Sequence, residues 1–398
     1  MKKQKLTFEE FKKSILNDYK IVCQSREASL LGRKEVLTGK AKFGIFGDGK
    51  EVAQVAMART FKHGDFRSGY YRDQTFMMAI GELTIEALFA QLYANTDLNQ
   101  EPASAGRQMN NHFATRSLDL NGQWKDIKNQ YNSASDISPT ASQMPRLLGL
   151  GHASKIYRKN TQLNNTQFSD SGNEIAYGTI GNASTSEGLF FETINASGVL
   201  QVPILLSIWD DGWGISVPSK YQTTKGDISE ILKGFQRTQQ KEGLQIYNVK
   251  GWDYSQLCET YIEASTLCRK NHIPVIIHVK EMTQPQGHST SGSHERYKST
   301  EELNWEKEFD CMKKMREWII SKNISTNKEL ESIEKEAKHL VKESQKKAWN
   351  NHLKKLTEEK TELCQIVKSS CNLQNNTIHQ IYTQLEQGKN PTRRLLIS

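Results

Sequence analysis

Two loops near the middle of the chain combine small residues with oxygen-bearing side chains, and each follows a short apolar run. The first loop, Gly181 to Ser184, contains Asn182, and the second, Asp210 to Gly214, contains Asp211. An amide and a carboxylate about 30 residues apart, one in each loop, are oxygen ligands of the kind that Mg²⁺ takes together with phosphate oxygens. Small residues between a strand and a helix also let a phosphate approach backbone N–H groups. The pattern predicts a site for a metal ion and a phosphorylated ligand.

The segments around these loops alternate between apolar strands and helices. We expect strands at 175–180, 202–208, 244–249 and 273–279, with helices at 184–199 and 256–269. This order predicts an α/β fold, in which a parallel sheet is covered by helices. Ligands bind at the carboxyl edge of such sheets, so the two loops should lie side by side there.

The chain outside this region is expected to be largely helical. We divide it into an N-terminal helical segment at 1–39, the sheet-containing domain at 40–300 and a charged helical C-terminal extension at 301–398. Helices are expected at 7–32 and 52–61, where apolar residues recur at three- or four-residue steps. The polar stretch 100–140 is too long for an idle connection, so it is either a functional loop or locally disordered.

The composition excludes several classes of protein. The 398-residue chain has a formal net charge of +8, but its basic residues are spread out, so we expect a solvated surface and no nucleic-acid partner. Its six cysteines show no paired or zinc-type spacing, which fits reduced thiols in the cytoplasm. No run approaches the roughly 18 apolar residues of a membrane helix, and residues 1–20 lack a signal-peptide core. We therefore expect a cytoplasmic protein that does not enter a membrane.

The paired loops resemble the thiamine-diphosphate motif, in which a GDG is followed some thirty residues later by an Asn. The closest likeness is to the alpha subunit of the E1 component of branched-chain 2-oxoacid dehydrogenases. The acidic and amide positions are exchanged here between Asn182 and Asp211, which keeps one carboxylate and one amide. The resemblance implies metal binding by Asn182, Asp211 and Trp213. Trp209 stands where branched-chain members carry an Arg that helps hold the diphosphate.

Further patches carry the resemblance across residues 40–297. Tyr70-Tyr71-Arg72-Asp73 matches the family's YRD, Gly106 to His112 matches GRQMPVH, Ser138 to Pro145 matches SPLATQIP, Gly212 to Ser216 matches GYAIS, and Gln286 to Ser291 matches GHHSTS. The resemblance implies catalytic acid-base roles for His112 and His288. It also implies cofactor binding by Tyr71, Arg72, Ser138, Thr140, Gly181, Asn182, Ala183, Ser184, Asp211 and His288. The segment at 138–145 corresponds to a loop that also holds a monovalent cation such as K⁺.

A second GDG, at Gly47-Asp48-Gly49, spells the motif literally. Thirty residues later the chain has only Met77 to Ile80, which offer no side-chain oxygen ligand. We therefore interpret Asp48 as a turn residue rather than a metal ligand.

The resemblance implies oxidative decarboxylation of a 2-oxoacid, with acyl transfer to a lipoyl acyltransferase. The family's cofactor sites lie between alpha and beta chains in an α2β2 assembly, and no second α/β pattern follows residue 300. We therefore expect one gene of an alpha/beta pair or the front part of an alpha-beta fusion. Two alternatives remain open: another thiamine-diphosphate enzyme, such as a transketolase-like protein, and a non-catalytic assembly or regulatory relative.

Overall fold

A parallel sheet of six strands forms the centre of the structure, a computed structural model that describes residues 7–163, 166–290, 292–372, 374–388 and 391–397. The strands lie in the order β2 (Asn132–Ser133), β1 (Phe66–Ser68), β3 (Ala176–Gly181), β4 (Ile204–Trp209), β8 (Val275–Lys280) and β7 (Gln245–Lys250). Each neighbouring pair is parallel. The predicted fold class, a parallel sheet covered by helices, is confirmed.

The four longer strands are the ones that the sequence predicts. β4 is buried at all six positions, which explains its continuous apolar sequence, because helices cover both faces of the sheet. β1 and β2 have only three and two residues, too few to produce a hydrophobic pattern. Side chains alternate between the faces: Leu205 packs into the core on one side, and Leu206 packs into the core on the other.

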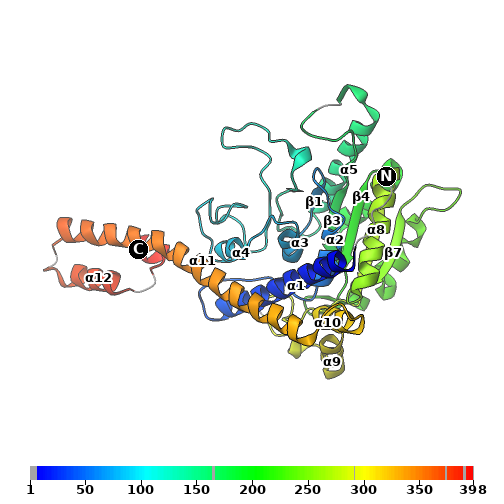
Figure 1. The fold of residues 1–398 in the computed structure, drawn as a ribbon. Helices are drawn as coiled ribbons and strands as arrows, with labels where there is room; N and C mark the ends of the chain where they lie inside the picture. The colour runs from blue at the N-terminus through cyan, green and yellow to red at the C-terminus, as the bar shows by residue number, and fades with distance from the viewer. Residues whose placement is uncertain (1–6, 164–165, 291, 373, 389–390, 398) are drawn as a thin grey trace.

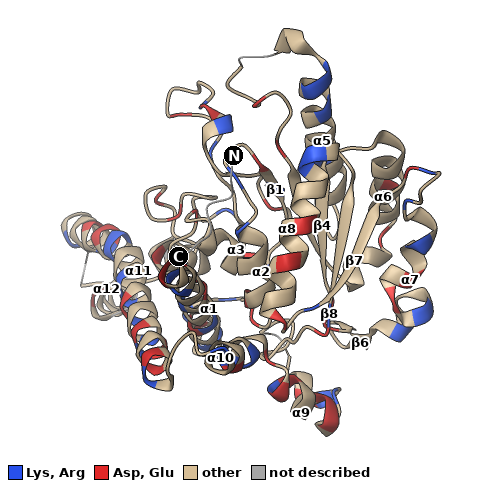
Figure 2. Ribbon diagram, turned by 45° about the vertical axis from the view of Figure 1, so that its right-hand side comes forward, with Lys and Arg blue, Asp and Glu red and all other residues tan. Residues whose placement is uncertain are grey.

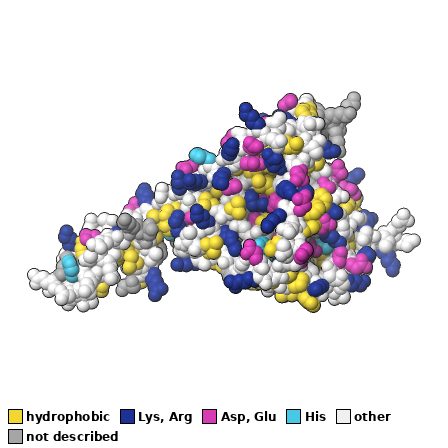
Figure 3. All heavy atoms as spheres, turned by 90° about the horizontal axis from the view of Figure 1, so that it is seen from below, with side chains coloured by type: hydrophobic (Ala, Val, Ile, Leu, Met, Phe, Trp, Pro, Cys, Tyr) yellow, Lys and Arg dark blue, Asp and Glu magenta, His cyan; other side chains and the backbone are white. Residues whose placement is uncertain are grey.

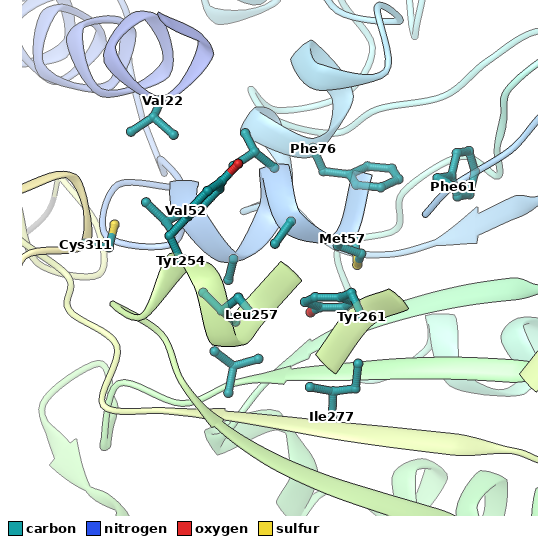
Figure 4. Packing of buried hydrophobic residues seen from close by; sticks show 14 of the residues in the cluster. Val22, Val52, Met57, Phe61, Phe76, Tyr254, Leu257, Tyr261, Ile277 and Cys311 are labelled. Atoms are coloured by element: carbon teal, nitrogen blue, oxygen red, sulfur yellow. The ribbon is translucent and has the colours of Figure 1, made fainter. Parts of the chain in front are cut away.

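Helices cover the two faces of this sheet in separate layers. One face packs against α2 (Glu51–Ala58) and α8 (Tyr254–Asn271). Leu257 and Tyr261 of α8 lie between Val52 of α2 and Ile277 of the sheet (Figure 4). The opposite face packs against α5 (Gln143–Lys159), α6 (Gly188–Leu200) and α7 (Ile228–Leu232). The carboxyl ends of the strands are left to the loops that form the candidate site.

Two long helices flank the sheet domain and pack against each other. α1 (Phe8–Leu37) begins with a capping box between Thr7 and Glu10, and its apolar face joins the main core. α11 (Asn327–Ser370) crosses α1 and then runs away from the body, with α12 (Asn376–Gln387) folded beside its far end (Figure 1). Lys and Glu are mixed along α11 (Figure 2). The expectation of a charged helical C-terminal extension fits this arrangement.

The structure also contains five shorter α-helices among the described residues. They are α3 (Gln74–Ala79), α4 (Ile85–Leu92), α9 (Thr300–Glu308), α10 (Cys311–Ser321) and α13 (Arg393–Ile397). Basic and acidic side chains are interspersed on the face of the molecule that Figure 3 shows. In the described part of the chain, no helix combines the length and the apolar character that a membrane crossing requires.

Candidate active site

Asn182 and Asp211 follow the neighbouring strands β3 and β4. Gly181 is paired with Trp209 in the sheet, and the backbone N–H of Asn182 donates to the carbonyl oxygen of Trp209 at 3.1 Å. A Cβ atom on Gly214 would lie 2.6 Å from the Cβ of Ala183, so this glycine allows the two loops to touch. The loops therefore meet at the carboxyl edge of the sheet, where the strand pattern places them.

The segment after β3 differs from the predicted helix at 184–199. A 3-10 turn covers Ala183–Ser186, and α6 begins only at Gly188, because Glu187 has an extended backbone (φ −74°, ψ 144°). Ser184 lies within this turn rather than at a helix start. Asn182 is buried, its carbonyl accepts from Thr185, and its side-chain amide donates to Ser219 Oγ at 3.1 Å.

Asp211 lies between two cationic or potentially cationic side chains. Its Oδ2 accepts from Lys50 Nζ at 2.7 Å, and its Oδ1 accepts from His288 Nε2 at 3.3 Å and from the backbone N–H of Trp213 at 3.2 Å. Burial alone would raise the pKa of Asp211, but the Lys50 ammonium and the His288 imidazole hold that pKa well below its usual range. Asp211 is therefore a carboxylate at neutral pH.

Lys50 and Asp48 are site residues that the sequence analysis missed. The Gly47-Asp48-Gly49 segment forms a turn, as predicted, with Lys50 N–H donating to Gly47 O at 3.2 Å. Asp48 is 1% exposed, and its Oδ2 accepts a hydrogen bond from the backbone N–H of Gln286 at 2.9 Å. This turn therefore holds the loop that contains His288. No periodic or spacing signal distinguishes Lys50 from the other lysines of the chain.

Arg72 links the segment before the Gly47–Gly49 turn to the loop that contains His288. Its Nη1 donates to Phe46 O at 2.6 Å and its Nη2 to His288 O at 2.8 Å. Its guanidinium carbon lies 5.4 Å from the ring centroid of Tyr71. In this structure, Arg72 therefore positions the His288 backbone.

His112 is buried and held at both ring nitrogens. Nδ1 lies 3.3 Å from Asn110 O, and Nε2 lies 3.0 Å from Ser138 Oγ. Because a carbonyl oxygen only accepts, Nδ1 carries the proton and Nε2 of a neutral imidazole accepts from the Ser138 hydroxyl. The Tyr71 ring lies nearly parallel to the His112 ring, with centroids 6.3 Å apart.

The polar stretch 100–140, which includes His112 and Ser138, is an ordered loop. Asn110, Asn111 and His112 are buried, and the amide groups of both asparagines donate to Ile45 O. The loop has a defined conformation, and its functional role stays a prediction. Thr140 is exposed in the turn before α5, and no hydrogen bond links it to the other site residues that the structure describes.

Trp209 lies in the core rather than at the loop surface. Its side chain is 1% exposed, and Nε1 donates to Asp73 Oδ1 at 3.2 Å. Asp73 Oδ2 also accepts from Arg67, whose side chain is fully buried. Trp209 therefore stabilises the strand end and the segment that contains Tyr71 and Arg72.

The loop after β8 contains several buried polar atoms with no hydrogen-bond partner among the described residues. They are Thr283 Oγ1, Gln284 Nε2, Gln286 Nε2 and His288 Nδ1. The two glutamine amide nitrogens are donors, and the threonine hydroxyl can donate. A buried donor without an acceptor costs on the order of 1–3 kcal/mol, so these three groups indicate a site shaped for an acceptor-rich ligand. A diphosphate fits this requirement. Ser291 of the same motif lies outside the described residues.

Asp211 and Trp213 also line a cavity of about 380 Å³. Its other walls include Asp227, Lys280, Lys298 and Trp305, whereas Tyr71, Arg72 and His112 do not line it. The described residues contain no group of three His, Cys, Asp or Glu side chains that could share a metal ion. A metal ion at this site would therefore need amide or backbone oxygens in addition to Asp211.

Comparison with known proteins places the chain in a family. The sequence pattern of the dehydrogenase E1 component matches residues 22–357. The chain belongs to the dehydrogenase E1 component family. Membership of this E1 family implies thiamine diphosphate as the cofactor. The predicted resemblance to branched-chain E1 alpha subunits is also confirmed by individual relatives of the chain.

Those relatives are named as subunits of 2-oxoacid dehydrogenases. The 2-oxoisovalerate dehydrogenase subunit alpha of Bacillus subtilis is 26% identical over 69% of this chain and 72% of its own length. Subunit alpha 1 of the same enzyme from Arabidopsis thaliana is 25% identical over 71% of this chain and 52% of its own length. The human subunit alpha is 24% identical over 77% of this chain and 60% of its own length. The matches thus span between 52% and 72% of these relatives' own lengths.

Proposed function

We propose that the chain is the alpha part of an E1 component that oxidatively decarboxylates a branched-chain 2-oxoacid and transfers the acyl group to a lipoyl acyltransferase. One observation carries the proposal most directly: Asn182 and Asp211 follow adjacent parallel strands, and Asp211 is held against the His288 loop. The names of the relatives, which specify 2-oxoisovalerate, support the branched-chain substrate class.

The chain offers a consistent set of residues for the cofactor. Asn182, Asp211 and Trp213 would hold Mg²⁺, and Gly181, Ala183 and Ser184 would let the diphosphate approach the backbone. Tyr71, Arg72, Ser138, Thr140 and His288 would complete the site, with the 138–145 loop holding a monovalent cation such as K⁺. The chemistry that bound thiamine diphosphate would supply is an electron sink for the pair released when CO₂ leaves the 2-oxoacid.

The two histidines provide proton transfer near the reacting atoms. Nε2 of His112 would exchange its bond with Ser138 for a bond to substrate. His288 donates through Nε2 to Asp211, which leaves Nδ1 available to a ligand. Their different partners suit different roles, because each partner fixes which nitrogen carries the proton.

The proposal includes a beta-type partner that completes the cofactor site. We expect an α2β2 assembly with the lipoyl acyltransferase as a further partner, since closed symmetry is the default for such assemblies. All six cysteines are free, which fits a reducing cytoplasm. Several relatives are named as mitochondrial, so a localisation experiment is needed to test the compartment.

The test is a steady-state assay of the chain with its co-purified partner. We expect 2-oxoacid-dependent dye reduction that requires both Mg²⁺ and thiamine diphosphate, with 3-methyl-2-oxobutanoate used better than pyruvate. His112→Ala and His288→Ala should reduce turnover, whereas Lys62→Met, an exposed lysine at the opposite edge of the sheet, should not. Cofactor retention without turnover on any 2-oxoacid would instead support a non-catalytic relative, and transfer between sugars would support a transketolase-like enzyme.

A further inference from the structure

The ammonium group of Lys50 is buried and fully hydrogen-bonded, unlike that of an ordinary surface lysine. Its side chain is 1% exposed, and Nζ donates to Asp211 Oδ2, Thr283 O and Gln284 Oε1, each at 2.7 Å. An ammonium has three N–H donors, so all of them are used. A lysine is almost never buried unless it is paired, and this one is paired with the carboxylate proposed to bind the metal ion.

The backbone around Lys50 fixes the position of its ammonium. Gly49 has φ +85°, and a Cβ atom there would lie only 2.0 Å from Thr283 O, so only glycine lets the turn pack against residue 283. Asp48 holds the same loop through Gln286 N–H at 2.9 Å. Lys50 therefore reaches Asp211 from a turn that is fastened to the neighbouring loop on both sides.

Both oxygens of Asp211 are engaged in this arrangement. Oδ2 bonds to Lys50, and Oδ1 accepts from Trp213 N–H and His288 Nε2. A divalent ion that binds Asp211 must take a remaining lone pair within a few ångströms of a fixed positive charge. Like charges at that distance repel strongly where water is excluded.

We propose that Lys50 is a built-in cation of the Asp211 site, which shares this carboxylate with the divalent metal ion. The ammonium holds Asp211 in position before the metal arrives and weakens the binding of free metal. The diphosphate of the cofactor brings negative charge that compensates both cations, so metal and diphosphate bind well only together. The inference rests on the proposed metal site and adds a coupling between metal binding and diphosphate binding.

The test is Mn²⁺ titration of the chain with its co-purified partner, with and without thiamine diphosphate. Electron paramagnetic resonance follows the free Mn²⁺. Lys50→Met should bind Mn²⁺ alone roughly 10-fold more tightly than the wild type. The gain in Mn²⁺ affinity that thiamine diphosphate gives the wild type should shrink in this variant. Lys62→Met is the matched control and should behave as the wild type.

Two further variants keep the test decisive. Lys50→Met/Asp211→Asn should lose the added affinity, and retention of it would place the ion elsewhere and overturn the proposal. If Lys50→Met does not fold, Lys50→Arg is used instead, because it keeps the positive charge. Tighter Mn²⁺ binding by Lys50→Arg than by the wild type would overturn the proposal. Unchanged or weaker Mn²⁺ binding by folded Lys50→Met would also overturn it. If the wild type binds no Mn²⁺ even with thiamine diphosphate, the proposed function itself fails.

Discussion

The indole N–H of Trp209 donates to Asp73 Oδ1 at 3.2 Å, which joins the end of strand β4 to the residue that follows Arg72. Trp209→Phe keeps most of the apolar volume but removes the donor to a buried carboxylate. We expect a loss of about 1–3 kcal/mol in the free energy of unfolding, measured by urea denaturation. Trp124→Phe, at a site that is 54% exposed, is the control and should change little. Equal stability of the two variants would show that the Asp73 bond contributes nothing.

Arg67 is the second partner of Asp73 and also pairs with Asp136 at 3.0 Å. Arg67→Met leaves two buried carboxylates without their cation, so we expect a loss of about 3–5 kcal/mol in stability. Arg59→Met, which breaks a more exposed pair with Asp18, should cost less in the same urea experiment. A smaller loss for Arg67→Met than for Arg59→Met would contradict this account.

Ser138 orients the imidazole of His112 through the 3.0 Å bond to Nε2. We expect Ser138→Ala to lower kcat about 10-fold with little change in KM, because the ring loses its orientation and substrate binding does not depend on it. His112→Ala should lower kcat by about 10²–10⁴-fold, the range for a lost acid-base group. Steady-state kinetics of the chain with its partner test both values. A Ser138→Ala effect confined to KM would assign Ser138 to binding instead.

His272 makes stability depend on pH. Burial and the nearby charge of Arg158 lower the pKa of His272 from 6.5 to about 4 in the folded chain, where Nε2 contacts Gly172 O at 2.9 Å. As the pH falls below 6.5, the unfolded chain binds a proton first, so stability is lost between pH 6.5 and 4. His272 caps α8 with a left-handed backbone (φ 54°), which Asn tolerates.

Urea denaturation across this range checks the prediction for His272. His272→Asn should lose less stability on acidification than the wild type does, whereas the exposed His379→Asn should keep the wild-type slope. The same slope in all three proteins would mean that other groups cause the acid sensitivity.

The sequence predicted the sheet because its four longer strands are apolar and lie between helical segments. β1 and β2 escaped prediction because a strand of two or three residues, held by its neighbours, carries no periodic signal. The start of α6 was placed four residues too early, since nothing in the residue types marks Glu187 as extended. The division at 39/40 and 300/301 stays a prediction.

Site residues that belong to a sequence motif were predicted. Residues that only the tertiary fold brings to the site were missed. Asn182, Asp211, His112 and His288 stand in recognisable patches, and the roles assigned to them stay predictions. Lys50 reaches Asp211 from 161 residues away in the sequence, so no local pattern links the two. Trp209 aligns with an arginine that helps hold the diphosphate in branched-chain members, so the sequence suggested a change in diphosphate binding. In the structure, Trp209 is instead a buried core residue.

Isothermal titration of thiamine diphosphate into the chain with its partner tests the central claim most directly. The wild type should bind the cofactor only when Mg²⁺ is present, and Asp211→Ala should bind it at least about 100-fold more weakly, because the carboxylate is the charged ligand of the metal. Wild-type affinity in Asp211→Ala, or binding that is independent of Mg²⁺, would contradict the account.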